Sequence, residues 1–542
     1  DDFEFIELLN VSDKNVVLTG SQLSKVDVDG DTEGVSFDFS EGDVATLAPG
    51  DRIVVVEDLA AFRARYGDQV AVAGEWDGAL SNNRETLTMT AYDGSVIQQF
   101  SYNDSGLWPE RADGRGSTLV SLDPAGNFND PENWIGSVSY LGSPGAPDAE
   151  SLGVVVNEVL AHTDPPLTPP DSIELFNTLS EPVDISGWYL SDSANQMLKY
   201  QIPNGTVLPA GGYVVFDEGD FNPTPLNPAP NHFALSSARG DDVWLVVAEN
   251  GKPSLIADDV HFGATPNGES LGRLPNGTGI LTPMSELSLG SVNSGPRVGP
   301  VIMSEVHYHP GSPAFNAQIL DPSITSDDLE FIEVYNPTGL PVDLTDWRIR
   351  GGVDYDFIPG TQLASGSTIV VIPFNPDKPE NVNRLAAFRA HHRIDQSVKL
   401  VGGFGGQLND LGEAVRLQRP DEPPAEDPNL IPRLLEDQVV YDVVAPWPDA
   451  SDNNRSLTRA AVSAYGNDPS SWKAEIASPG QTAFVVGPIF GDMNQDGRLS
   501  VEDIDLVCSA VLNGGDETYD LNADGNVDVA DVNYLVEDVI GT

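Results

Sequence analysis

The feature that most constrains this chain is an internal repeat of about 150–160 residues. The segment EFIELLNVSDKNVVLTG at 4–20 resembles SIELFNTLSEPVDISGWYL at 172–190 and EFIEVYNPTGLPVDLTDWRI at 330–349. In each copy, apolar and acidic residues alternate before a shared asparagine (Asn10, Asn177, Asn336). Because alternation with a period of two is typical of a strand with one buried face, each copy is predicted to open with β-structure. The chain therefore consists of repeated β units.

The correspondence continues downstream of these strands. TLAPGDRIVVVED at 46–58 matches VLPAGGYVVFDEG at 207–219 and QLASGSTIVVIPF at 362–374, each a turn that feeds a β-branched strand. AAFRARYG at 60–67 matches AAFRAHHRI at 386–394. SPG closes the first copy at 143–145 and the third at 478–480, and the second is expected to end near NSGPR at 293–297. Fifty-two Gly and 42 Pro punctuate short apolar runs, and long helical periodicity is nearly absent before residue 490, so we predict β-sandwiches.

The predicted boundaries follow from the repeat. We expect β-sandwiches over 1–150, 151–298 and 299–480, a linker over 481–490 and a separate module over 491–542. The second and third copies begin with an additional strand, VVVNEVLAH at 154–162 and VIMSEVHYHP at 301–310, which the first copy lacks. Since a sandwich without its first strand exposes an unpaired edge, we expect the chain to be part of a longer protein.

These motifs resemble the lamin tail domain family. The N-E-V/S-E-V strand, the E-F-I-E-x-x-N strand and the V-D-L-x-x-W strand carry the resemblance, which covers residues 1 to about 480. It implies immunoglobulin-like β-sandwiches in an exported bacterial protein, and a structural or binding role, because the family's fold carries no catalytic residues.

The C-terminal segment has a different character. GDMNQDGRLSVED at 491–503 fits the calcium-loop pattern, and DLNADGNVDVAD at 520–531 repeats it. Gly497 and Gly525 stand at the sharp turn of each loop. Hard oxygen ligands in this number favour Ca²⁺ over Mg²⁺, so two Ca²⁺ ions are predicted. The predicted ligands are Asp492, Asn494, Asp496, the carbonyl of Arg498, Ser500 (direct or through water), Asp503, Asp520, Asn522, Asp524, the carbonyl of Asn526, Asp528 and Asp531.

Each loop precedes an apolar stripe with helical spacing. The stripes are Ile504, Val507, Cys508, Val511 and Leu512, then Val532, Leu535, Val536, Val539 and Ile540, and we expect them to pack together. This duplicated loop–helix form, with Asp where ordinary EF-hands carry Glu, resembles the type I dockerin family. The resemblance implies docking to a cohesin-like protein through Val501/Glu502 and Val529/Ala530 in the loops, and Cys508/Ser509 and Val536/Glu537 on the helices. The Ser-Thr pair common in that family is missing, which puts a standard cohesin partner in doubt.

Composition excludes several classes of protein. Lys+Arg is 27 and Asp+Glu is 84, a net charge of −57, which argues against nucleic acid and anionic membranes as partners. A single cysteine excludes a disulfide framework and a cysteine-rich zinc module. No apolar run approaches the ~18–20 residues of a membrane span, so membrane insertion is not expected.

Four further motifs each have a structural and a functional interpretation. G-E-S-L-G at 268–272 spells a hydrolase nucleophile motif, but it falls inside a β repeat rather than between a strand and a helix. GGFGG at 402–406 lacks the following Lys of a phosphate loop. His307 and His309 would share a strand face as half-exposed residues or as metal ligands. Asp27, Asp29, Asp31 and Glu33 form an acidic hairpin turn or a further calcium site.

The sequence thus predicts a non-enzymatic, secreted bacterial scaffold, located outside the cell or on its surface. It would be structural or adhesive, and its calcium-stabilised C-terminal module would dock to a cohesin-like protein or mediate self-assembly. One alternative is the accessory region of a secreted hydrolase that binds polysaccharide through an aromatic platform at Trp76, Trp108 or Trp447. Another is the subunit of a surface layer or fibre.

Overall fold

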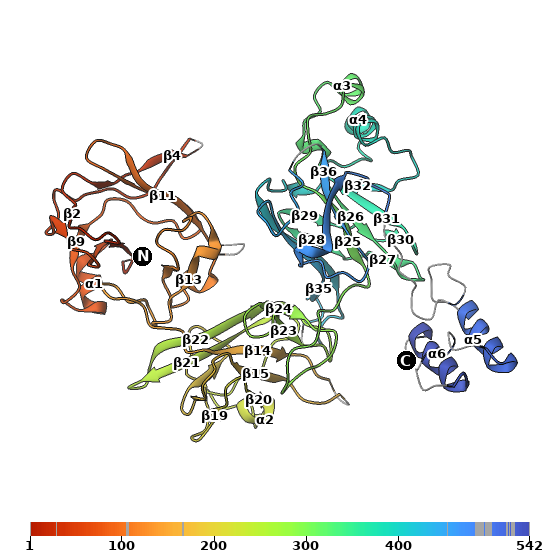
Figure 1. Cartoon of the computed structure of the whole chain (residues 1–542), viewed down its shortest axis with the longest axis horizontal. Helices are drawn as coiled ribbons and strands as arrows, with labels where there is room; N and C mark the ends of the chain where they lie inside the picture. Colours follow the sequence, from red (N-terminus) through yellow and green to blue (C-terminus); the bar gives the residue numbers. More distant parts are fainter. Residues whose placement is uncertain are drawn as a thin grey trace. The chain divides into compact units, whose positions relative to one another are not determined.

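The computed structural model describes the chain except for residues 1, 29, 105–107, 165–166, 426, 452–453, 483–492, 494–500, 516–518, 520, 522–525 and 541–542. The described chain is mainly β (Figure 1). It divides into two compact units, one formed by Asp1–Phe262, Ser270–Leu281 and Leu287–Asn293, the other by Gly263–Glu269, Thr282–Glu286 and Ser294–Thr542. The three predicted sandwich ranges are called the first, second and third repeat below, and their boundaries remain predictions.

In the first repeat, two sheets face each other across a small core. One has the order β1-β8-β9 and the other β11-β10-β3-β6. The bounds are β1 (Phe5–Leu9), β3 (Gln22–Leu23), β6 (Phe37–Asp38), β8 (Arg52–Val56), β9 (Val72–Glu75), β10 (Arg84–Thr90) and β11 (Val96–Asn103). Three further pairs are β2 (Val16–Val17) with β7 (Thr46–Leu47), β4 (Val26–Val28) with β5 (Asp31–Glu33), and β12 (Leu119–Ser121) with β13 (Trp134–Gly136).

The second repeat has the same plan with a fuller first sheet. Its sheets run β20-β15-β14-β23-β24 and β18-β17-β21-β22, beside the pair β16-β19. The bounds are β14 (Val154–Leu160), β15 (Ser172–Asn177), β16 (Val183–Asp184), β17 (Tyr189–Ser191), β18 (Tyr200–Gln201), β19 (Val207–Leu208), β20 (Tyr213–Asp217), β21 (Asp241–Glu249), β22 (Lys252–Phe262), β23 (Leu271–Leu274) and β24 (Ile280–Pro283). β14, which the first repeat lacks, lies between β15 and β23.

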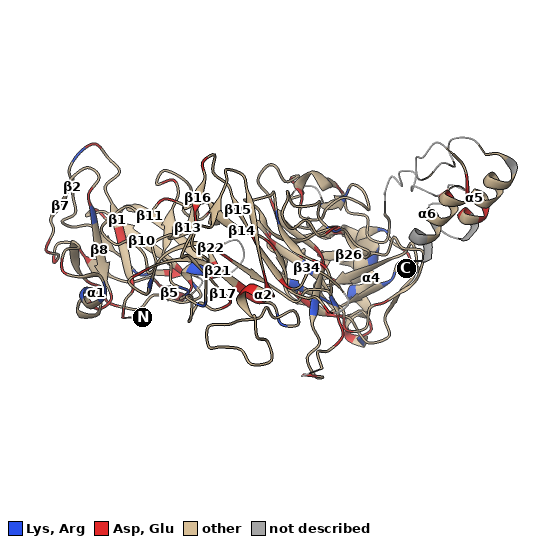
Figure 2. Cartoon of the chain, turned by 90° about the horizontal axis from the view of Figure 1, so that it is seen from below, with Lys and Arg blue, Asp and Glu red and all other residues tan. Residues whose placement is uncertain are grey.

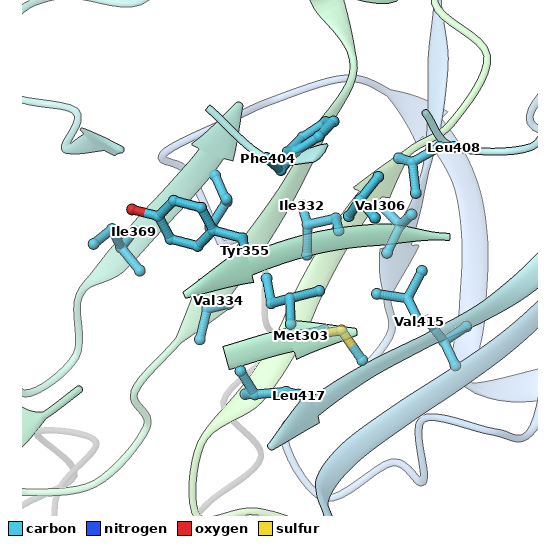
Figure 3. Close-up of a cluster of buried hydrophobic side chains, with 14 of the residues drawn as sticks. Met303, Val306, Ile332, Val334, Tyr355, Ile369, Phe404, Leu408, Val415 and Leu417 are labelled. Carbon is cyan, nitrogen blue, oxygen red and sulfur yellow. The ribbon is translucent and has the colours of Figure 1, made fainter. Parts of the chain in front are cut away.

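The third repeat is the largest. Its sheets run β32-β31-β26-β25-β36-β37 and β33-β29-β28-β34-β35, beside the pair β27-β30. The bounds are β25 (Ile302–His307), β26 (Phe331–Tyr335), β27 (Val342–Asp343), β28 (Arg348–Gly351), β29 (Val353–Asp356), β30 (Gln362–Leu363), β31 (Thr368–Ile372), β32 (Leu400–Gly402), β33 (Gly405–Gly406), β34 (Gly412–Pro420), β35 (Arg433–Asp442), β36 (Arg455–Arg459) and β37 (Trp472–Ile476). Figure 3 shows apolar side chains of both sheets meeting in its core, among them Met303, Ile332 and Leu417.

The shared asparagine has the same task in every repeat. Its side-chain nitrogen donates to a carbonyl four residues on, at 2.8 Å, from Asn10 to Lys14, from Asn177 to Glu181 and from Asn336 to Leu340. Each asparagine is buried and also donates to the next strand pair, as Asn10 does to Leu47 at 2.9 Å. A buried amide with all of these partners fixes the polar turn between the two strands that the sequence pattern identified.

Short helices cover the second face of some strands, which the sequence did not predict. They are α1 (Leu59–Tyr66), α2 (Glu218–Phe221), α3 (Phe315–Leu320) and α4 (Val382–His392). Phe62 of α1 packs on Val54 and Val56, and Phe388 of α4 packs on Val370 and Ile372. The near-continuous apolar runs of β8 and β31 follow from burial on both faces. Before the C-terminal segment, the described chain also has 3₁₀ turns at Glu110–Ala112, Pro131–Asn133, Asp327–Leu329, Pro379–Asn381 and Pro469–Ser471. No helix in the described ranges has the length and apolar character needed to cross a membrane.

Candidate metal centre and buried carboxylates

Two amphipathic helices form the C-terminal segment, as the sequence predicted. They are α5 (Val501–Asn513) and α6 (Val529–Ile540). Their core is built on the buried side chains of Val507 and Leu521, with Met493, Ile504 and Val532 packed around them. Leu512, predicted to lie in this core, is 83% exposed, because the helix turns it away at the end of the stripe. Leu521 instead comes from the second loop and had no helical pattern to reveal it.

The last residue of each predicted calcium loop is buried and holds the start of its own loop. Asp503 Oδ1 accepts from the backbone N–H of Met493 at 2.9 Å, and Asp531 Oδ1 accepts from that of Leu521 at 2.8 Å. Both aspartates have no exposed surface. The two bonds each join residues ten apart, and the second pair lies 28 residues after the first. The loops therefore close in the same way twice.

The other predicted ligands divide into two groups. Asn526 and Asp528 are exposed, and Asp528 Oδ1 accepts from Ala530 N at 2.8 Å, so this carboxylate caps α6. Those outside the described residues are Asp492, Asn494, Asp496, Arg498, Ser500, Asp520, Asn522 and Asp524. Among the described residues, no three His, Cys, Asp or Glu side chains are grouped to hold a metal ion. The donor chemistry fits Ca²⁺, because residues 491–542 contain thirteen carboxylates and a single basic residue, Arg498.

In each sandwich, a glutamate of the I-E strand binds the tail of its repeat. Glu7 accepts from Gly145 N at 2.6 Å, Glu333 accepts from Gly480 N at 2.5 Å, and Glu174 accepts from Gly290 N. The equivalent of the S-P-G tail in the second repeat is thus Ser288–Gly290, just before NSGPR at 293–297, near which the second copy is predicted to end. Leu289 stands where the other two tails have proline, so the sequence motif did not reveal the equivalence.

A second glutamate lies on the strand that only the second and third repeats possess. Glu158 Oε1 accepts from Ser270 Oγ at 2.5 Å, and its Oε2 accepts from Ser288 Oγ at 2.9 Å. In the third repeat, Glu305 accepts from Ser456 Oγ and from Ser478 N, the latter at 2.8 Å. The hydroxyl of Ser270, in the G-E-S-L-G motif, is therefore engaged with a buried carboxylate. The motif leads into β23 rather than into a helix.

An Arg–Asp pair, buried in the third repeat and partly buried in the second, joins the two sheets of each of these repeats. The pairing of β14 shifts between Val156 and Glu158, and that of β25 between Met303 and Glu305. The N–H groups of Val156 and Met303 donate at 2.7 Å to Asp258 and Asp437 respectively. Arg273 bonds Asp258 at 2.8 Å, and Arg459 bonds Asp437 through both terminal nitrogens. This pair was not predicted from the sequence, although Arg273 and Arg459 stand at matching positions in S-L-G-R and S-L-T-R.

Burial changes the proton affinity of these carboxylates. Desolvation raises the pKa of Glu305 to about 8, with the charge of Glu333 adding to it, and raises the pKa of Glu333 itself to about 7. In the second repeat, desolvation raises the pKa of Glu174 to about 7. Each carboxylate accepts two or more hydrogen bonds, which oppose the shift. The arrangement links folding to proton binding near neutral pH.

The histidines of the third repeat differ from the prediction. His307 is fully buried, whereas His309 lies beyond the end of β25, half-exposed, with Nδ1 3.5 Å from Asp410. The prediction that both are half-exposed on one strand face is therefore wrong for His307. Its ring packs against Phe331 at 5.2 Å and against His392 at 5.7 Å, between α4 and the sheet. Burial lowers the pKa of His307 to about 3, so the ring is neutral at pH 7.

The other candidate motifs are placed as follows. Asp27, Asp31 and Glu33 belong to the β4–β5 hairpin, in agreement with the predicted acidic hairpin turn. Asp29 lies outside the described residues. GGFGG contributes to β32 and β33. Trp76 is buried in the first core and cannot meet a sugar, whereas Trp108 and Trp447 are half-buried. Trp108 packs against Trp134 at 6.1 Å. Figure 2 shows Asp and Glu spread along the described chain rather than gathered in one patch.

One family model matches two segments of the sequence. Residues 147–261 and 295–421 both match the lamin tail domain family model. Both matched segments contain the opening strand and the following I-E strand of their repeat. Together they contain most of both sheets of the second and third repeats. A solved structure of a DUF4876 family protein from Bacteroides thetaiotaomicron is 12% identical and covers 59% of this chain and 95% of its own, with a TM-score of 0.21. No curated protein matches the sequence.

Proposed function

We propose that this chain is a non-enzymatic, exported scaffold whose C-terminal module binds two Ca²⁺ ions and serves as its docking point. The observation that carries the proposal is the paired closure of the loops by Asp503 and Asp531. In the lamin tail-like repeats, every buried carboxylate described above is engaged by serine, glycine or arginine within the fold. The repeats would therefore serve as a structural support, and the C-terminal module would bind the partner.

The module would take the dockerin-like, EF-hand form. Asp503 and Asp531 would hold the ions from the helix side, and Asp492, Asn494, Asp496, Asp520, Asn522 and Asp524 from the loop side. When bound, Ca²⁺ supplies the positive charge that lets two acidic loops pack against one small core. Helices α5 and α6 would then present a fixed surface to a cohesin-like protein outside the cell, where calcium is millimolar.

The test is hydrogen exchange of α5 and α6 in calcium and in chelator, with helix content followed by circular dichroism. Calcium is expected to slow exchange in both helices, and Asp503→Asn should abolish much of that protection. Asp505→Asn is the matched control, since Asp505 is an exposed carboxylate two residues further along α5. Equal exchange in calcium and chelator would contradict the proposal.

A second candidate function, saccharide binding, is favoured by a shallow cleft of about 560 Å³. Tyr140, Asn195, Gln196, Lys199 and Asn231 contribute to its lining. An aromatic ring beside exposed amides suits a neutral sugar, which stacks on the ring and hydrogen-bonds to the amides. Affinity gel electrophoresis in dextran or xylan tests it. Retardation that Tyr140→Ala removes would support saccharide binding, and equal migration with and without polysaccharide would contradict it.

A further inference from the structure

The outer edge of β22 is covered by a segment that follows the first repeat's last hairpin. Ser139 forms an antiparallel β-bridge with Leu255. Tyr140 N donates to Ser254 O at 3.0 Å, and Ile256 N donates to Val138 O at 2.8 Å. The segment is held extended by Asp148, whose carboxylate accepts from Val138 N at 2.7 Å and from Ser139 N at 3.0 Å. Residues 138–140 thus add a short strand to the sheet of the second repeat.

Two ion pairs reinforce this strand addition. Arg111 Nη1 lies 3.0 Å from Asp259, and Arg115 Nη1 lies 3.4 Å from Asp242. All four side chains are partly buried, so water screens the pairs less than it screens fully exposed ones. The contact therefore combines main-chain hydrogen bonds with ion pairs. The ion pairs join residues just before β12 of the first repeat to β21 and β22 of the second.

The equivalent strand of the third repeat, β35, is covered as well. Ala264 forms a parallel β-bridge with Leu434, and Arg297 Nη2 donates to Leu435 O at 2.6 Å. Both contacts come from residues that precede the first strand of that repeat's sheets. In both repeats, the chain that precedes the repeat or its first strands therefore covers the edge strand. This cover blocks an edge that could otherwise pair with another chain.

The first repeat has the same edge without a cover. β11 stands at the end of the order β11-β10-β3-β6, as β22 does in β18-β17-β21-β22, and no strand of the described chain pairs with its outer side. Val96 and Ile97 on it are 57% and 52% exposed. Asn129 caps one outer amide, accepting from Ser101 N at 2.9 Å. Within the described part of the chain, Val96–Phe100 of β11 offer an open edge to another strand.

The complementary segment is exposed at the end of the third repeat. Lys473–Ile476 lie at the same distance before Gly480 as Val138–Leu141 lie before Gly145. They form the outer part of β37, the last strand of the six-stranded sheet, and Ile476 is 71% exposed. Arg455 Nη1 donates to Ala474 O at 2.6 Å and would release it on pairing.

We propose that β11 of one molecule receives residues 473–476 of a second copy, so that the chains join head to tail. The contact repeats between molecules the strand addition that residues 138–140 make on β22 within the chain. It is heterologous, because the donor and acceptor surfaces differ, and it therefore leads to filaments rather than closed dimers. The proposal goes beyond the proposed function, since it involves no part of the calcium module.

Two features make this contact weak. Counted from Trp108 and Trp447, the positions of Arg111 and Arg115 are occupied in the third repeat by Ala450 and Asn454, so both ion pairs are lost. The net charge of −57 also opposes association until salt screens it. We therefore expect assembly at high protein concentration in about 0.5 M salt, where the screening length is only a few ångströms.

Sedimentation velocity of the full chain, run over rising protein concentration in high salt, tests the proposal. We expect oligomers that grow with concentration equally in calcium and in chelator. Gln99→Pro removes an edge N–H of β11 and should weaken association at least tenfold, whereas Gln99→Ala, which keeps that N–H, should not. Ile476→Asp should weaken association from the donor side. A thermal melt of each variant shows that it is folded.

Mixing the two variants gives the decisive readout. Gln99→Pro retains a working donor and Ile476→Asp a working acceptor, so an equimolar mixture should form dimers and stop there. A wild-type chain that stays monomeric at about 0.5 mM would overturn the proposal. A dissociation constant above that concentration would be too weak for a useful protein contact. Wild-type association that Gln99→Pro leaves unchanged would overturn it too, and association lost only in chelator would assign assembly to the C-terminal module instead.

Discussion

The backbone N–H of Leu521 donates to the buried carboxylate of Asp531 at 2.8 Å, closing the second acidic loop of the C-terminal module. Met493 and Asp503 make the same bond in the first loop at 2.9 Å. Residues 491–542 hold thirteen carboxylates and one basic residue, Arg498. Acidic loops of this composition are suited to binding a cation, which we propose to be Ca²⁺.

The stability of the third repeat should fall as pH rises through neutrality. The pKa of Glu305 is raised to about 8 from its usual 4.5, so the folded chain holds a proton that the unfolded chain releases. The contribution of Glu305 to stability is therefore fully present below about pH 4.5 and is lost as pH rises through about 8. His307, with a lowered pKa, acts in the opposite sense, but only below about pH 6.5. Between about pH 6.5 and 8.5, the free energy of unfolding should decline by up to about 1.4 kcal/mol per pH unit because of Glu305, and Glu305→Gln should remove that part of the decline, which melting temperatures follow.

The matched control for this experiment is Glu380→Gln, because Glu380 is exposed. A wild-type melting temperature that does not change over this pH range would contradict the assignment. A decline in melting temperature that Glu305→Gln and Glu380→Gln alter equally would contradict it as well.

Asp346→Gly should stabilise the third repeat. The turn before the β3, β17 and β28 strands requires a left-handed backbone, with φ of 89° at Gly20, 80° at Gly187 and 62° at Asp346. Only the third repeat places a residue with a Cβ there, at a cost of about 0.5–1 kcal/mol. We expect the variant to raise the denaturation midpoint accordingly, and the reverse change, Gly187→Asp, to lower that of the second repeat. A lower midpoint for Asp346→Gly would contradict the strain argument.

Removing one member of the buried Arg–Asp pair should be severely destabilising. Arg459 is fully buried and bonds Asp437 with two nitrogens, while Asp437 also accepts from Met303 N. Arg459→Met leaves the carboxylate unpaired, at a cost of about 3–5 kcal/mol in urea unfolding. The double variant Arg459→Met/Asp437→Asn should recover part of that loss, because the amide is neutral. If the double variant were less stable than the single one, the pair would not be the source of the effect.

The repeat and its strands could be predicted because their signals are local. The alternation around Glu7, Glu174 and Glu333 and the asparagine after it lie within a few residues, and the structure gives these residues equivalent roles in the three repeats. The apolar stripes of α5 and α6 are local in the same way. The strand order of one sheet in the second repeat and one in the third, however, depends on pairing across more than a hundred residues, Glu158 with Gly272 and Glu305 with Thr458.

The parts that sequence did not predict depend on distant partners or weak patterns. Arg459 lies 22 residues from Asp437 and 156 from the Met303 carbonyl to which it also donates, so no spacing rule connects them. Helix α1 has eight residues and almost no amphipathic pattern, although Asp58 caps it and Gly67 follows it. The burial of His307 depends on α4, whose contact with the sheet no pattern near His307 indicates.

Calcium titration calorimetry of the full chain counts the ions that the C-terminal loops are proposed to bind. We expect two Ca²⁺ ions per chain. Asp503→Asn and Asp531→Asn should each remove one ion or weaken its binding at least tenfold, about 1.4 kcal/mol, while Asp505→Asn should leave both unchanged. Absence of binding at millimolar calcium, or binding that Asp503→Asn and Asp531→Asn leave intact, would contradict the proposed assignment of the C-terminal loops as calcium sites.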